Sequence, residues 1–172
     1  MIRSNIALIG FMGSGKSTAG RLLATRRNKT FLETDALIED RACMRIEDIF
    51  NQFGEERFRE FEAQVVAQVS AAADAVISCG GGAVLRPENA ALLKASSIVV
   101  FLDVLPETVL WRIGPGSRMR PLLEGVDREA RVNELMAARR PVYSAVADFT
   151  VRTDGVSVDE VVSIIEEELD RL

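Results

Sequence analysis

The residues best suited to chemistry lie near the start of the chain, where Gly10 to Ser17 read Gly-Phe-Met-Gly-Ser-Gly-Lys-Ser. This segment matches the pattern G-x-x-x-x-G-K-[ST] and directly follows the apolar run Ile6–Ile9. A strand that enters a glycine loop and then a helix forms a cradle whose backbone N–H groups bind nucleotide phosphates. We expect Lys16 to reach the β- and γ-phosphates and the Ser17 hydroxyl to bind Mg²⁺. A glycine turn without a ligand is the alternative.

Two carboxylates, Glu33 and Asp35, follow the short strand-like run Thr30–Leu32. Side chains two apart on an extended segment share a face, and ligands bind at the carboxyl ends of parallel strands. Glu33 would then hold Mg²⁺ through water, and Asp35 would take a proton from an attacking hydroxyl group. Capping of the following helix by Asp35 is the alternative.

Two arginines are candidates for binding an anionic substrate. Arg59 lies off the apolar stripe of its helical segment, so it can point at an anion, although taken alone its position favours a surface ion pair with Glu55 or Glu62. Arg139 would supply a second guanidinium group for a carboxylate, with ion pairing on a helix surface as the alternative.

Glycine marks two further segments. The third strand-like run ends in Gly80-Gly-Gly82, which predicts close approach of the backbone to a ligand, or otherwise a tight turn. Residues 114–125 are rich in glycine and proline yet carry Arg118 and Arg120. We interpret this segment as a lid that brings arginine to phosphate, with a plain surface loop as the alternative.

The composition limits the classes of protein that remain. A chain of 172 residues with 48% hydrophobic and 27% charged residues predicts one globular domain, residues 1–172. The net charge of −5 argues against a nucleic-acid surface, and the lack of a long apolar run argues against a membrane span. We expect a monomer.

Residue types that are rare or missing constrain the chemistry further. Cys43 and Cys79 are too few for a disulfide framework or a zinc site, and we expect reduced thiols in a cytoplasmic protein. Because the chain has no histidine, a general base must be a carboxylate, Lys, Tyr or Cys. Any metal must be held by oxygen, which suits Mg²⁺.

The elements that must position these residues alternate along the chain. Strand-like runs are Ile6–Ile9, Thr30–Leu32, Ala75–Ser78, Ile98–Leu102 and Phe149–Arg152. Helical patterns cover 16–27, 35–42, 45–52, 55–72, 88–95, 106–113 and 128–146. This alternation predicts an α/β fold with a parallel sheet and helices on both faces. A last helix begins at a capping box, Ser157 with Glu160, and its acidic run 166–168 is expected to face water.

Taken together, the motifs resemble those of the shikimate kinase family in order and spacing, from about residue 5 to residue 155. The matching segments are Ile9–Thr18, Asp35-x-x-Ile38-Glu39, Ile49-Phe-x-x-x-Gly-Glu-x-x-Phe-Arg59-x-x-Glu62, Gly80-Gly-Gly82, Arg120-Pro-Leu-Leu123 and Arg139-x-Pro-x-Tyr143. The resemblance implies a P-loop three-layer fold of the nucleoside-monophosphate-kinase type, with a five-stranded parallel sheet and a lid at 114–125. It also implies a substrate-binding region at 33–62.

The same resemblance implies an activity and a set of site residues. The activity is ATP-dependent phosphorylation of the 3-hydroxyl of shikimate, giving shikimate 3-phosphate and ADP, in the chorismate pathway to aromatic amino acids. Shikimate would bind Asp35, Arg59, Gly80, Gly81, Gly82 and Arg139. The nucleotide would bind Gly13, Ser14, Gly15, Lys16, Ser17, Thr18, Arg112 and Arg120, with residues near Thr153-Asp154 on the far side of the adenine. Catalysis would rest on Lys16, Asp35 and Arg120, and Mg²⁺ on Ser17 and Glu33.

The chain departs from this pattern at two positions. Glu33 stands where the family usually has the first aspartate of Asp-x-Asp, so the metal contact has one methylene more to span. Cys43 replaces a usual glycine. Asp103, which follows Val-Val-Phe-Leu like a Walker-B aspartate, is interpreted as structural.

Two other functions remain compatible with the residues alone. One is a related P-loop kinase for another small hydroxy-acid such as gluconate, because paired arginines fit any carboxylate. The other is a non-catalytic nucleotide-binding regulatory module, against which the intact Lys16, Ser17, Asp35 and Arg120 argue.

Overall fold

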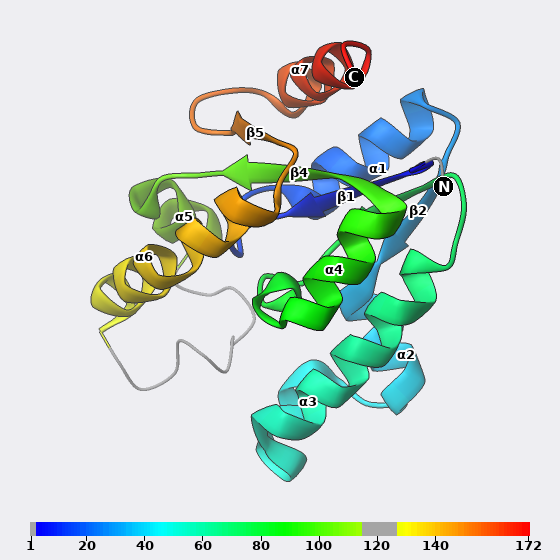
Figure 1. Cartoon of the computed structure of the whole chain (residues 1–172). Helices are drawn as coiled ribbons and strands as arrows, with labels where there is room; N and C mark the ends of the chain where they lie inside the picture. The colour runs from blue at the N-terminus through cyan, green and yellow to red at the C-terminus, as the bar shows by residue number, and fades with distance from the viewer. Residues whose placement is uncertain (1–2, 115–126) are drawn as a thin grey trace.

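A single twisted sheet forms the centre of the molecule (Figure 1). The computed structural model describes residues 3–114 and 127–172. Within these residues, five parallel strands follow the order β2-β3-β1-β4-β5. The strands are β1 (Asn5–Ile9), β2 (Thr30–Glu33), β3 (Ala75–Ser78), β4 (Ser97–Asp103) and β5 (Phe149–Arg152). The predicted α/β fold and the predicted strands are confirmed.

The helices also follow the predicted pattern, with one difference. They are α1 (Lys16–Arg26), α2 (Thr34–Ala42), α3 (Ile46–Ser70), α4 (Pro87–Ser96), α5 (Pro106–Ile113), α6 (Arg128–Val146) and α7 (Val158–Leu169). The two helices predicted at 45–52 and 55–72 join into the kinked α3, whose interruption is Gly54 with φ 78° and ψ 178°. Glycine adopts such positive φ values at little cost, so the chain bends there without ending the helix.

Helices cover both faces of the sheet, so its central strand is buried on both sides. Ile6 and Leu8 pack with α1 and α7, whereas Ala7 and Ile9 belong to the larger core beneath α3, α4 and α6. This alternation explains why the strand reads as a continuous apolar run. From β1 the chain builds β2 and β3 on one side and β4 and β5 on the other. The carboxyl end of β1 therefore lies where the strand order reverses, the usual ligand site of such sheets.

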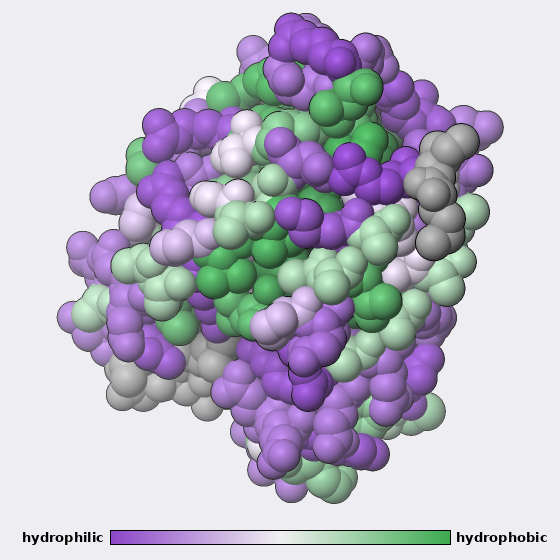
Figure 2. Space-filling view, in the orientation of Figure 1, coloured by the Kyte–Doolittle hydropathy of each residue, from purple (hydrophilic) through white to green (hydrophobic). Residues whose placement is uncertain are grey.

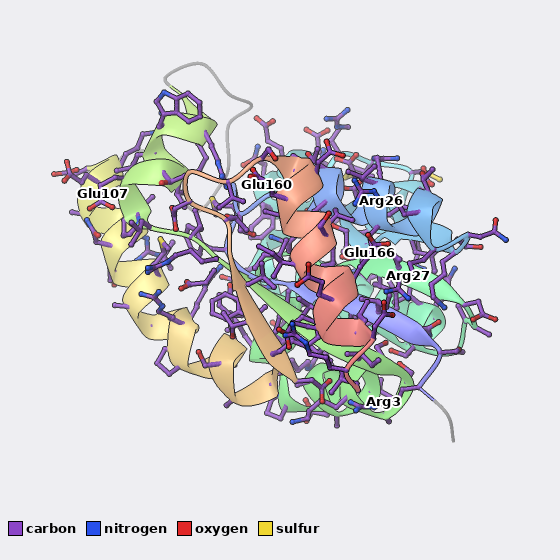
Figure 3. All side chains as sticks on the ribbon, turned by 90° about the horizontal axis from the view of Figure 1, so that it is seen from above. Arg3, Arg26, Arg27, Glu107, Glu160 and Glu166 are labelled. Atoms are coloured by element: carbon purple, nitrogen blue, oxygen red, sulfur yellow. The ribbon has the colours of Figure 1, made fainter. Side chains whose placement is uncertain are left out.

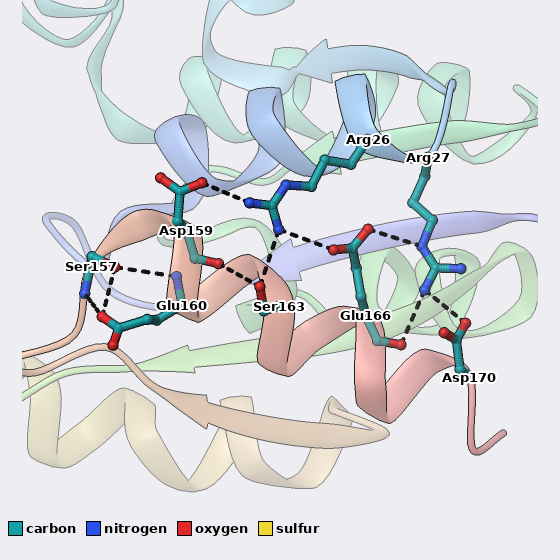
Figure 4. Close-up of polar contacts among 8 residues, drawn as sticks. All are labelled: Arg26, Arg27, Ser157, Asp159, Glu160, Ser163, Glu166 and Asp170. Atoms are coloured by element: carbon teal, nitrogen blue, oxygen red, sulfur yellow. Dashed lines mark hydrogen bonds and ion pairs between the residues drawn. The ribbon is translucent and has the colours of Figure 1, made fainter.

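A network of ion pairs fastens α7 to the end of α1 (Figures 3 and 4). The Arg26 guanidinium lies 2.6 Å from Asp159 and 3.2 Å from Glu166, and Arg27 lies 2.8 Å from Asp170. The predicted capping box of Ser157 and Glu160 starts the helix. The expectation that the whole acidic run faces water is wrong for Glu166, because this side chain is shared by both arginines and is half-buried.

On the face shown in Figure 2, hydrophilic residues dominate the periphery and apolar ones gather near the middle. Of the described helices, none combines the length and the apolar character that crossing a bilayer requires.

Cys43 follows the last residue of α2 and adopts a left-handed conformation with φ 51° and ψ 35°. A side chain costs free energy in this conformation, whereas glycine does not pay it. We expect Cys43→Gly to raise the free energy of unfolding by about 1 kcal/mol, measured by urea denaturation. Cys43→Ala keeps the Cβ atom and should give no such gain. Equal stabilisation by both variants would locate the effect in the thiol rather than in the backbone.

Candidate active site

The loop between β1 and α1 curls around a cavity, here called the phosphate cavity. Three of its glycines have positive φ values: Gly10 (142°), Gly13 (76°) and Gly15 (94°). A Cβ atom on Gly10 would lie 2.5 Å from the Leu102 carbonyl oxygen, so the loop can only take this path with glycine. The cavity is lined by Met12, Gly13, Gly15, Lys16, Ser17, Thr18, Glu33, Asp35, Ser78, Cys79, Gly80 and Gly81.

Lys16 is buried in the curve of this loop. Its Nζ atom donates hydrogen bonds to the carbonyl oxygens of Gly10 (2.9 Å) and Phe11 (2.8 Å). The ammonium group therefore lies beside the backbone N–H groups of the loop and the N-terminus of α1. This concentration of positive charge suits a polyphosphate.

The two predicted carboxylates reach the phosphate cavity by different routes. Glu33 is the last residue of β2 and occupies the N-cap position of α2, while Asp35 lies in the first turn of that helix. The argument from a shared face of an extended segment is therefore wrong, although both side chains line the same cavity. The capping alternative for Asp35 is wrong as well, because Glu33 holds that position.

Glu33 sits between two donors on α1. One of its oxygens accepts the Ser17 hydroxyl, and the other accepts Arg21 Nη2 at 2.8 Å. A hydroxyl oxygen and a carboxylate at the edge of a phosphate cradle are hard oxygen donors, the type that Mg²⁺ binds together with substrate phosphates. The residues present thus fit this ion. Within the described residues, no group of three or more acidic, cysteine or histidine side chains is arranged to hold a metal, so an ion here would depend on the hydroxyl, the carboxylate and the substrate phosphates together.

A second cavity, the arginine cavity, opens beside the first. It is lined by Met12, Asp35, Ile46, Phe50, Phe58, Arg59, Glu62, Gly80, Gly81, Gly82 and Arg139. Four of these residues, including Asp35, also line the phosphate cavity. The structure thus brings together Asp35, both predicted arginines and the glycine turn from α2, α3, α6 and the loop after β3.

Arg59 is ion-paired, as one alternative predicted, and it also faces a cavity. It lines the arginine cavity and also pairs with Glu55 (2.9 Å) and Glu62 (2.8 Å). Partial burial acts to lower the pKa of Arg59, but the attraction of Glu62 and Glu55 holds the pKa above its ordinary value. The guanidinium group is therefore charged and oriented.

Glu62 lines the arginine cavity, although the sequence reasoning considered it only as a member of the family motif and as a surface ion-pair partner of Arg59. The residue is 1% exposed, and burial raises the pKa of its carboxyl group, with Arg59 opposing the shift. The spacing of three residues from Arg59 was the available signal. Because Glu62 lies on the buried side of α3, it anchors Arg59 from beneath.

In the turn after β3, neighbouring side chains leave no room for a Cβ atom at Gly80 or Gly82. A Cβ atom on Gly80 would lie 2.6 Å from Asp35 Oδ1, and one on Gly82 would lie 2.3 Å from Arg59 Nη1. The sequence predicted that a ligand would approach this backbone closely. In the structure, the groups that approach it are the side chains of Asp35 and Arg59. The Tyr143 hydroxyl donates to the Gly81 carbonyl oxygen and fixes the turn, a long-range contact that sequence reasoning missed.

Arg139 is buried at 7% exposure, and its guanidinium carbon lies 5.8 Å from the centre of the Phe11 ring. Ion pairing on a helix surface therefore does not describe it. Its neighbour Arg140 instead pairs with Asp103. Asp103 lines neither the phosphate cavity nor the arginine cavity, which fits its structural interpretation.

On the far side of the loop lies a third cavity, the nucleoside cavity. Its lining is Ser14, Gly15, Thr18, Ala19, Arg112, Thr153, Val156, Val158 and Val161. Arg112 donates to the carbonyl oxygens of Gly13 (3.0 Å) and Thr153 (2.7 Å), which ties it to both walls. Asp154 does not line this cavity and instead accepts the backbone N–H of Leu105. Arg120 and the rest of the predicted lid from residue 115 onward lie outside the described residues.

These features define a class of protein. A parallel sheet of order β2-β3-β1-β4-β5, with a phosphate-binding loop after its central strand, is the fold of P-loop kinases of the nucleoside-monophosphate-kinase type. An adjacent cavity with a carboxylate and two arginines is suited to a small anionic acceptor.

Comparison with known proteins identifies the family within this class. The family model described as shikimate kinase matches residues 12–170. The shikimate kinases of Symbiobacterium thermophilum and Moorella thermoacetica are each 48% identical to this chain over 96% of its length. The matched segments cover 95% and 94% of those two proteins, respectively. The chain belongs to the shikimate kinase family, and it has that family's ATP-dependent activity in the shikimate pathway.

A solved structure supports the same assignment. The shikimate kinase from Acinetobacter baumannii in complex with shikimate is similar with a TM-score of 0.93 and 34% identity, covering 99% of this chain and 95% of that chain. The predicted family and fold are thereby confirmed.

Proposed function

We propose that phosphoryl transfer from ATP to the 3-hydroxyl of shikimate takes place at the boundary of the phosphate and arginine cavities. The observation that carries this proposal is that Asp35 lines both cavities. A phosphoryl donor in one cavity and a hydroxyl acceptor in the other would meet beside this carboxylate. Positioning of this kind is the main requirement of phosphoryl transfer.

On the acceptor side, Arg59 and Arg139 would bind the carboxylate of shikimate. Their guanidinium groups face one cavity from α3 and α6, and Glu62 and Phe11 limit their freedom. The N–H groups of Gly80, Gly81 and Gly82 would add further donors. Asp35 would orient the reacting hydroxyl and accept its proton as the new bond forms.

On the donor side, residues Gly13 to Thr18 would hold the phosphates, with Lys16 on the β- and γ-phosphates. Arg112 and the nucleoside cavity would receive the adenosine. Arg120, carried by a lid at 114–125, would neutralise charge on the transferring group and complete the enclosure.

Mg²⁺ would be held by the Ser17 hydroxyl and, through water, by Glu33, both of which fit it as hard oxygen donors. When bound, the ion neutralises the charge that develops on the phosphate oxygens. Lys16 and the loop N–H groups act on the same charge from the protein side. Glu33, although longer than the aspartate usual in the family, already contacts the Ser17 hydroxyl.

We further propose that residues 1–172 form one P-loop kinase domain, with substrate-binding region 33–62, and act as a monomer in the cytoplasm. The two thiols, one exposed and one buried, support a reducing compartment.

A coupled assay of ADP release tests the acceptor. The full chain with Mg²⁺-ATP is supplied with shikimate, gluconate or a nucleoside monophosphate, and a mixture without acceptor measures hydrolysis. We expect turnover with shikimate at least about 100-fold above the others, because a site built to pair with specific hydroxyl groups rejects analogues strongly. Turnover with gluconate at a similar rate would contradict the proposed acceptor, and ADP release without any acceptor would contradict the proposed transfer.

A further inference from the structure

Arg21 is an exposed arginine on α1 that none of the roles above includes. Its side chain is 64% exposed, yet it contacts two residues of β2 at once. The Arg21 guanidinium carbon lies 4.5 Å from the centre of the Phe31 ring, and Nη2 lies 2.8 Å from Glu33 Oε2. An exposed arginine with two defined contacts is held in one orientation.

These contacts follow from the periodicity of the two elements. Ser17 and Arg21 are four apart and share a face of α1, whereas Phe31 and Glu33 are two apart and share a face of β2. Gly20 allows the two faces to meet, because a Cβ atom there would lie 2.7 Å from Phe31. The strand therefore presents its ring to Arg21 and its carboxylate to both Arg21 and Ser17.

The two oxygens of Glu33 have separate partners. Oε2 accepts Arg21, and Oε1 accepts the Ser17 hydroxyl. A serine hydroxyl has one proton and two lone pairs, so a hydroxyl that donates to Glu33 keeps its lone pairs for another partner. Those lone pairs are what a hard cation binds.

From this arrangement we propose that Arg21 is a positioning residue for the metal: it fixes Glu33, which in turn orients the Ser17 hydroxyl with its lone pairs available to Mg²⁺. The inference rests on the proposed metal role of Ser17 and Glu33. A glutamate has one more rotatable bond than an aspartate and loses more freedom when it is ordered. A second contact on Oε2 compensates for this freedom, which explains how the chain tolerates Glu33 at this position.

The test measures binding rather than turnover. Isothermal titration of the non-hydrolysable ATP analogue AMP-PNP is carried out once with excess MgCl₂ and once with EDTA. We expect Arg21→Ala to weaken binding about threefold to fivefold with Mg²⁺, the size expected for loss of a largely exposed ion pair, and to leave binding in EDTA unchanged. Arg21→Lys keeps the charge but not the planar group. With Mg²⁺, its affinity for AMP-PNP should lie between that of the wild-type protein and that of Arg21→Ala.

Arg57→Ala is a matched control. The Arg57 guanidinium carbon lies 4.6 Å from the centre of the Phe61 ring, and Arg57 pairs with Glu60, so the same kinds of contact are removed on α3. This control should change neither measurement. A loss of AMP-PNP affinity in EDTA as large as the loss with Mg²⁺ would overturn the proposal, because it would indicate a general disturbance of α1.

The background Glu33→Ala separates this inference from the proposed metal site. If the relay exists, Glu33→Ala weakens binding with Mg²⁺, and adding Arg21→Ala to it has no further effect. An effect of Glu33→Ala without any effect of Arg21→Ala would overturn the role of Arg21 while keeping the metal site. No effect of Glu33→Ala on the Mg²⁺ dependence would overturn both.

Discussion

Asp35→Asn is expected to lower kcat by about 10²- to 10⁴-fold, the range associated with loss of a general base, while the affinity for ATP stays nearly constant. Asparagine has the size of aspartate but cannot take a proton from the reacting hydroxyl. Asp35 lines both cavities and lies close to Gly80, so the change removes a charge at the point of transfer without opening space. The loss should therefore appear in the chemical step.

The measurement pairs kcat from the coupled ADP-release assay with the affinity for AMP-PNP from isothermal titration. Asp40→Asn, an exposed position on the same helix α2, serves as the control and should retain full activity. A fully active Asp35→Asn enzyme would exclude Asp35 from catalysis. A large loss of nucleotide affinity would instead indicate that the carboxylate supports the architecture of the loop.

Arg59→Ala is expected to weaken shikimate binding by about 10- to 100-fold, the value of a lost hydrogen bond to a charged group, and to change nucleotide affinity far less. It is also expected to destabilise the fold, because it leaves Glu62 buried without its guanidinium partner. Since burial already raises the pKa of Glu62 above its ordinary 4.5, the loss of stability should grow as the pH rises and the buried carboxyl group ionises.

A double variant separates the two effects of Arg59. Arg59→Ala with Glu62→Gln removes the buried charge, so urea denaturation at neutral pH should show more stability than for Arg59→Ala alone. Isothermal titration with shikimate should show no recovery of affinity. If affinity returned together with stability, Arg59 would act through the fold and the proposed contact with the substrate carboxylate would be wrong.

Much of this site was predictable because local chemistry determines it. The phosphate loop depends on glycines at fixed spacing, and the strands are buried on both faces, so each appears as an apolar run. The triple glycine after β3 also signalled close approach. Each of these features depends on residues that are close together in the sequence, and sequence patterns predict such local features best.

The errors and omissions have a common physical cause. Whether Glu33 and Asp35 share a face depended on where β2 ends, and strand ends are set by tertiary contacts. Glu62 looked like a surface residue because only the packing of α3 shows that its side chain is buried. The Tyr143 contact with Gly81 joins residues 62 positions apart, which no local pattern reveals.

The shared position of Asp35 has a consequence for inhibitors that join a nucleotide to an acceptor mimic. A linker between the two halves must pass the only stretch common to both cavities, which Met12, Asp35, Gly80 and Gly81 line within the described residues. A phosphate-like anionic linker would meet the Asp35 carboxylate there and be repelled by it. A neutral or hydrogen-bond-donating linker would meet an acceptor in place of a repelling charge, and its length would be set by the passage at Asp35 rather than by either pocket.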